Sequence, residues 1–130
     1  MKFLQPPNWP RPKGYANGVA TRGSMVFLSG IVGWNAQGEF AAHDFPSQVR
    51  QALRNIVEIL DQAKAKPEHI ARMTWYVLDK RAYLDASRSI GQIYRELMGN
   101  HYPVMTAVQV GALIEDRALV EIEATAVLPE

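Results

Sequence analysis

The chain has 130 residues, of which 14 are basic and 13 acidic, so the formal net charge is +1, and 48% of the residues are hydrophobic. This balance argues against the basic surface that nucleic-acid binding requires, and no apolar run is long enough for a signal peptide or a membrane helix. The absence of cysteine excludes disulfides, thiolate nucleophiles and thiolate metal sites. We therefore expect one domain over residues 1–130, located in the cytoplasm, with no nucleic-acid or membrane partner.

Residues 1–13 are predicted to form an extended arm, because they contain four prolines, which lack amide donors. An ordered arm needs an anchor, and we expect Trp9 to pack against the body of the domain. Residues 15–40 then contain short, apolar, β-rich runs that are broken by the glycine turns "RGS" and "AQG". These runs predict two or three antiparallel strands joined by hairpins.

A helical period begins after Asp44, which is a plausible N-cap, with Pro46 in the first turn. Pro67 is predicted to stop this helix, since its ring disfavours helical backbone in the residue before it. The apolar face of the helix consists of Phe45, Val49, Ala52, Leu53, Ile56, Val57, Leu60 and Ala63.

The second half of the chain alternates strand and helix patterns. A strand is predicted at 71–79, a helix from about 80 to 98, and two strands at 106–113 and 118–128. The helix contains Gly91, which costs roughly 1 kcal/mol against alanine and therefore suggests close packing against another backbone.

This order of elements predicts an α+β fold: a mixed sheet with two helices packed on one face. The other face then has no cover, although its strands carry too many apolar residues for a solvated surface. An exposed apolar face of this kind usually marks an interface, and a closed ring of identical copies would bury it.

The clearest candidates for chemistry are Glu121 and Glu123, which point to the same face of the last strand. One interpretation is a solvated edge; the other is a cleft carboxylate whose partial burial raises its pKa toward a range useful for proton transfer. Ser29 lies at a strand end, and Tyr15 and Trp34 flank the first strands, where they could wall a pocket or belong to the core. No histidine spacing suggests a metal site, and no glycine-rich phosphate loop is present.

Several short motifs, in this order, resemble the Rid family of reactive intermediate deaminases, also called the YjgF family. The motifs are "GYANGV", "MVFLSG", "QVRQALRNIVEIL", "MTWYVLDK" and "YPVMTAVQVGAL…VEIEATAV". The resemblance implies a chorismate-mutase-like fold and a homotrimer whose sheets form a central barrel, with a small-molecule ligand in each cleft between subunits. It also implies hydrolysis of enamines and imines such as 2-iminobutanoate to the 2-keto acid and ammonia, without a cofactor.

The family's functional positions carry over unevenly. Its pocket tyrosine, its serine and its water-holding glutamate match Tyr15, Ser29 and Glu121. Its arginine, in the motif P-A-R-[ST], is replaced by Met105, and the glutamine after "SG" is replaced by Ile31. The resemblance thus implies a site that keeps the carboxylate for water but has lost the cation for the substrate's carboxylate. With Ile31 and Trp34 also placed in the cleft, we expect a more apolar or aromatic ligand.

Three hypotheses remain open at this stage. The first is a hydrolytic deaminase for a substrate other than a simple imino acid, such as an aminomuconate-type intermediate, with Arg117, Arg22 or Arg11 supplying the cation. The second is a trimeric binding or regulatory protein without turnover. The third is the ribonuclease or translation-inhibitor activity of older family names, which the charge balance does not support.

Overall fold

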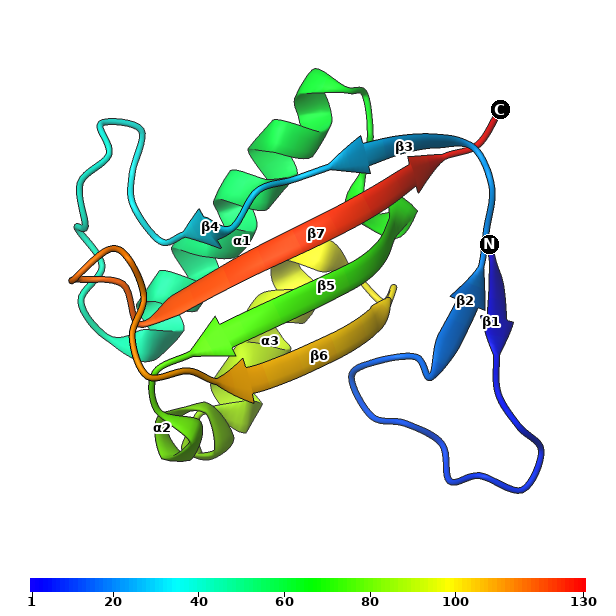
Figure 1. The fold of residues 1–130 in the computed structure, drawn as a ribbon, viewed down its shortest axis with the longest axis horizontal. Helices are drawn as coiled ribbons and strands as arrows, with labels where there is room; N and C mark the ends of the chain where they lie inside the picture. Colours follow the sequence, from blue (N-terminus) through cyan, green and yellow to red (C-terminus); the bar gives the residue numbers. More distant parts are fainter.

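The computed structural model describes all 130 residues and consists of a mixed sheet covered on one face by helices (Figure 1). The strand order is β3-β7-β5-β6, and the short strand β4 also pairs with β7. β5 and β6 run parallel, whereas β3, β4 and β5 are antiparallel to β7. The strands of the sheet are β3 (Ser24–Phe27), β4 (Ile31–Val32), β5 (Ile70–Val77), β6 (Val104–Gln109) and β7 (Val120–Leu128). The predicted α+β architecture and its parallel pairing are confirmed.

All helices lie on one side of the sheet, behind it in Figure 1. They are α1 (Phe45–Gln62), α2 (Lys80–Asp85) and α3 (Ser87–Met98), and a 3₁₀ turn, η1, spans Pro67–His69. α1 begins as predicted, because the Asp44 carboxylate accepts a hydrogen bond from the Ser47 amide at 2.8 Å and Pro46 lies in the first turn. It ends at Gln62, earlier than predicted, in a turn with Lys64 at a positive φ of 57°; Pro67 instead opens η1.

The core lies between the helices and the two central strands. Alternate residues of β5 and β7 point toward the helices, which buries Met73, Trp75 and Ile122 almost completely. They pack in one cluster with the buried stripe of α1, namely Val49, Ala52, Leu53, Ile56 and Leu60. This cluster fixes which side chains of each strand face away from the helices.

The opposite face of the sheet has no cover within the chain, as the sequence predicted (Figure 1). Phe27 and Met25 on β3 pair with Thr125 and Val127 on β7, so all four share this face. Phe27 is 71% exposed and Met25 57% exposed. The face therefore presents large apolar side chains that this chain does not bury.

The amino-terminal region differs from the prediction. Lys2–Leu4 forms strand β1, which pairs with β2 (Gly18–Ala20) in a separate two-stranded sheet beside β6. The "RGS" turn therefore does not join paired strands, because β2 pairs with β1 and β3 pairs with β7. The expectation that Trp9 anchors the arm is wrong: this residue is 58% exposed, and backbone pairing between β1 and β2 holds the arm instead.

The second predicted helix is also interrupted. Ala86 lies between α2 and α3 and is the C-cap of α2, whose N-cap is Asp79. The expectation that Gly91 lies against another backbone is wrong as well, because a Cβ added there would meet only the Arg95 side chain, at 3.3 Å. None of the helices combines the length and apolarity that a membrane crossing requires.

Candidate functional site

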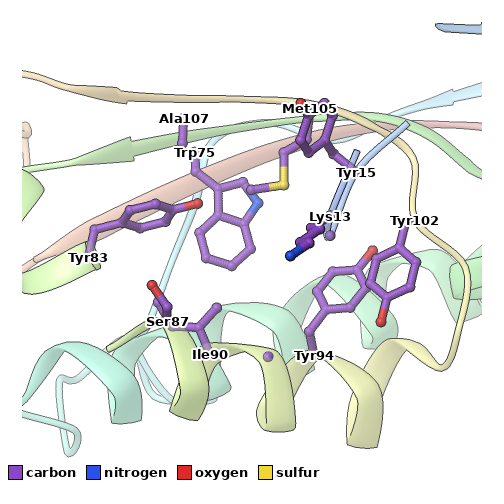
Figure 2. A pocket seen from close by; sticks show the side chains of 12 residues that line it. Lys13, Tyr15, Trp75, Tyr83, Ser87, Ile90, Tyr94, Tyr102, Met105 and Ala107 are labelled. Atoms are coloured by element: carbon purple, nitrogen blue, oxygen red, sulfur yellow. The ribbon is translucent and has the colours of Figure 1, made fainter. Parts of the chain in front are cut away.

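A cavity of about 400 Å³ opens between the sheet edge at β6 and helix α3 (Figure 2). We call it the aromatic pocket, since most of its large lining side chains are aromatic. Its lining residues are Lys13, Gly14, Tyr15, Trp75, Tyr83, Ser87, Ile90, Gly91, Tyr94, Tyr102, Met105 and Ala107. This is a size and composition typical of small-molecule sites.

The parallel register of β5 and β6 builds one wall of the pocket. Met105 pairs with the core residue Met73, and Ala107 pairs with Trp75, so the β6 side chains follow the buried ones toward the helices. The segment before β2 closes the wall beside them, because the Ala16 amide donates to the Pro103 carbonyl at 3.0 Å. This bond positions the preceding segment so that Lys13 and Tyr15 lie at the pocket mouth.

Aromatic pairs fix the shape of the pocket. The ring of Tyr83 meets Trp75 edge-on at 6.2 Å, and Tyr94 stacks on Tyr102 with ring centroids 5.5 Å apart. The Tyr94 hydroxyl donates to the His101 carbonyl at 3.1 Å. Burial raises the pKa values of Tyr83 and Tyr94, so both phenols stay neutral well above physiological pH.

Two donor groups of the pocket lining have no partner within the chain. The indole nitrogen of Trp75 is buried and has no hydrogen-bond partner. Lys13 is the only charged residue of the lining. Neither Arg11 nor Arg117 lines the pocket, and Arg22 lies elsewhere, 3.8 Å from Glu130. Within one chain, the cation beside Met105 is therefore Lys13. Only arginines had been predicted for this role from the sequence.

The predicted carboxylates lie on the uncovered face of the sheet. Glu121 pairs with Tyr76 and Val32, and its carboxyl group lies so close over Gly30 that a Cβ added there would be 2.7 Å from Glu121 Cδ. Glu123 is engaged differently, since its Oε1 accepts a hydrogen bond from the Tyr76 hydroxyl at 2.8 Å. That bond to Glu123 is the main reason why the pKa of Tyr76 is raised. The two carboxylates are thus distinct: one is bound to a tyrosine, and no hydrogen bond or ion pair engages the other.

The structure brings only some of the predicted site residues together. Tyr15 and Met105 share the aromatic pocket, and Ser29 immediately precedes the Gly30 that contacts Glu121. Ile31 and Trp34 instead line a shallow hollow against α1, where Asn55 donates to the Trp34 carbonyl at 2.8 Å. Within one chain, therefore, Met105 and Glu121 lie on opposite faces of the sheet.

The sequence analysis missed most of the pocket. Neither Trp75 nor Tyr94 was predicted to line a ligand site. No group of three or more histidine, cysteine or acidic side chains is placed to hold a metal ion.

The fold and the pocket together define a class: an α+β protein with a small-molecule cavity at the edge of a mixed sheet. Residues 9–128 match the family described as Endoribonuclease L-PSP. The chain belongs to this family, the Rid or YjgF family, as its motifs predicted.

Known relatives and solved structures agree with this membership. A Rid-family protein of unknown function from Yersinia pestis superposes with a TM-score of 0.86 at 31% identity, over 98% of both chains. A RutC family protein from Pyrococcus horikoshii is 31% identical over 92% of this chain and 91% of its own length. The 2-iminobutanoate/2-iminopropanoate deaminase of Salmonella typhimurium is 32% identical over 87% of this chain and 86% of its own.

Proposed function

We propose that this protein is a cofactor-independent hydrolase that deaminates an enamine or imine intermediate. The observation that carries the proposal is the Glu121 carboxylate, which lies over Gly30 without a protein partner, at the position where the family resemblance places the water-holding glutamate. The relationship to a named imine deaminase supports the same reaction class.

The proposed reaction adds water across a C=N bond. The imine binds with its nitrogen already protonated from solvent. Glu121 takes a proton from water while the water oxygen bonds to the iminium carbon, which gives a neutral carbinolamine. The carboxylic acid then returns its proton to the nitrogen as the C–N bond breaks and the hydroxyl proton is lost. The products are a carbonyl compound and ammonia, so the imine and one water are consumed without any oxidant or reductant.

A complete site in this proposal needs more than one copy of the chain. The aromatic pocket opens beside β6, whereas Glu121 lies on the uncovered face with Phe27 and Met25. A closed trimer that packs these faces into a central barrel would bury the exposed apolar residues. It would also allow Glu121 of one copy to meet the pocket of its neighbour in a cleft between subunits.

A second candidate function is ligand binding without turnover. Met105 favours it, because a thioether replaces packing but not the charge that an arginine would offer to a substrate's carboxylate. This candidate keeps the trimer and the pocket, and differs only in the absence of a chemical step.

The test generates imines in situ from amino acids with an amino-acid oxidase and competes semicarbazide capture against hydrolysis by the protein. We expect the wild type to lower semicarbazone yield for at least one imine, and Glu121→Gln to abolish the effect while folding stays intact. Glu123→Gln is the matched control on the same face and should retain activity. Equal loss in both variants, or no hydrolysis of any imine by a properly assembled wild type, would exclude the proposed mechanism. Light scattering should give about three times the 14.6 kDa chain mass.

A further inference from the structure

The aromatic pocket presents donors and a positive charge to a ligand, but no carboxylate. No acidic residue lines it, and Lys13 is its only charged residue. Figure 2 shows the Lys13 amine directed into the space between Trp75 and Tyr94. No ion pair engages this amine, so its charge is available to a ligand.

The indole nitrogen of Trp75 is the second observation, and it is independent of the first. Trp75 is 1% exposed, yet its N–H has no partner in the chain. In Figure 2 the nitrogen lies on the edge of the ring that faces Met105 and Lys13 rather than Tyr83. Buried donors are nearly always paired, and indole nitrogen can only donate. We expect a ligand to satisfy this donor with an acceptor when it displaces the side chains that cover the nitrogen.

The remaining walls select the body of the ligand. Trp75, Tyr94 and Tyr102 offer rings, and Met105 offers a flexible thioether that packs well against aromatic groups. Gly91 leaves room at α3, because it has no side chain and no backbone packs against it. These surfaces suit a planar ring better than a short aliphatic chain.

We infer that the aromatic pocket binds an aryl-substituted 2-oxo or 2-imino carboxylate, with its ring among the aromatic walls. Its carboxylate pairs with the Lys13 amine, and one of its oxygens or its imine nitrogen accepts from Trp75 Nε1. The inference deepens the proposed function and rests on it for the reaction, but the binding step can be tested without turnover.

The probes are phenylpyruvate and 2-oxobutanoate, which are the keto acids with and without a ring, titrated by calorimetry into the assembled protein. We expect phenylpyruvate to bind at least tenfold more tightly, because the ring adds apolar burial. Lys13→Gln should weaken phenylpyruvate binding about tenfold through the loss of a charge-assisted bond, and Lys64→Gln, a remote exposed lysine, should not change it. Trp75→Phe, which keeps a ring but removes the N–H, should cost about fivefold.

Gly91→Leu provides a variant whose fold should be retained, because an added Cβ would meet only the end of the flexible Arg95 side chain. Leucine is a better helix former than glycine, so the melting temperature should hold or rise. The new side chain should occupy the pocket and abolish phenylpyruvate binding. Together with Trp75→Phe, whose folding is checked by its melting temperature, it separates loss of the site from loss of the fold.

The inference is overturned if Lys13→Gln binds phenylpyruvate as tightly as Lys64→Gln, if Gly91→Leu still binds it, or if the two keto acids bind equally. Failure of the proposed reaction looks different: phenylpyruvate would bind with the predicted variant pattern, but no imine would be hydrolysed. Conversely, hydrolysis of 2-iminobutanoate without any binding of phenylpyruvate would keep the reaction and exclude this ligand class.

Discussion

Gly30 offers a way to move the Glu121 carboxylate without altering its chemistry. A Cβ added at Gly30 would lie 2.7 Å from Glu121 Cδ and 2.8 Å from Oε2. Carbon atoms in contact prefer about 3.5–4.0 Å, so in Gly30→Ala the carboxyl group must retreat by about 1 Å. Gly30 does not have a positive φ, and therefore alanine fits its backbone.

The two consequences should differ greatly in size. Folding should change by less than about 1 kcal/mol, because the contact is with the end of a flexible side chain and alanine restricts the unfolded chain. A displacement of about 1 Å in a group that positions a reactant can cost roughly 100-fold in rate. We therefore expect Gly30→Ala to lower imine hydrolysis by about two orders of magnitude while its thermal unfolding stays close to that of the wild type.

The matched control is Gly111→Ala. Gly111 also lacks a positive φ, and a Cβ there would meet nothing within 4 Å. Both variants are assayed by semicarbazide competition, and both are melted by circular dichroism. If Gly30→Ala hydrolyses imines as fast as Gly111→Ala, the position of the Glu121 carboxylate does not matter, and its assignment as the catalytic residue is refuted.

Three further predictions concern a charge in the pocket, the pH dependence of stability and a helix cap. We expect the wild type to hydrolyse 2-iminobutanoate slowly. Met105→Arg should raise this rate, but only partly, because no neighbouring acidic group in the pocket would orient the guanidinium. An unchanged rate would contradict the charge argument. Because the pKa of Tyr94 is raised in the folded chain, the contribution of this neutral phenol to stability is fully present below its unfolded pKa of about 10 and is lost as the pH rises above that value. Tyr94→Phe should therefore flatten the fall in melting temperature between about pH 9 and 11. Equal slopes in the variant and the wild type would contradict this. Asp44→Ala should lower stability by about 1 kcal/mol, because it removes the side chain that accepts from Ser47 N, and the melting temperature should fall by about 4 °C. Asp44→Asn, which can still accept this bond, should keep most of that stability. Equal losses in the two variants would show that the cap bond contributes nothing.

The fold followed from the sequence where local patterns are strong. The helical stripe after Asp44 has the period, the cap and the proline of a surface helix, and α1 begins where they indicate. The uncovered sheet face was also predictable, because two helices can cover only one face and the strands carry apolar residues on both. The β1–β2 pairing was not, since three residues of strand among prolines give no periodic signal.

The candidate site was predictable only through the family resemblance. Tyr15 and Met105 were expected to share a cleft, and they line one pocket. Trp75 and Tyr94 were not foreseen there, because their position depends on how the β5–β6 register meets α3 across the interior. Lys13 could not be found from sequence either: its place depends on the bond between Ala16 and Pro103, which joins residues far apart in the chain.

In the proposed site, the exchange of an arginine position for Met105, with Lys13 nearby, would change how a carboxylate is held rather than whether it is held. A guanidinium fixes both oxygens in a planar fork, whereas an ammonium on a flexible stem is a point charge that leaves orientation open. Lys13 is exposed at the pocket mouth, so salt screens its attraction more than it would screen a buried pair. Orientation in this pocket must then come from the rings and from the directional N–H of Trp75. A ligand without a ring would lose that orientation, so we expect a small imino acid to fit this pocket less well than an aryl one.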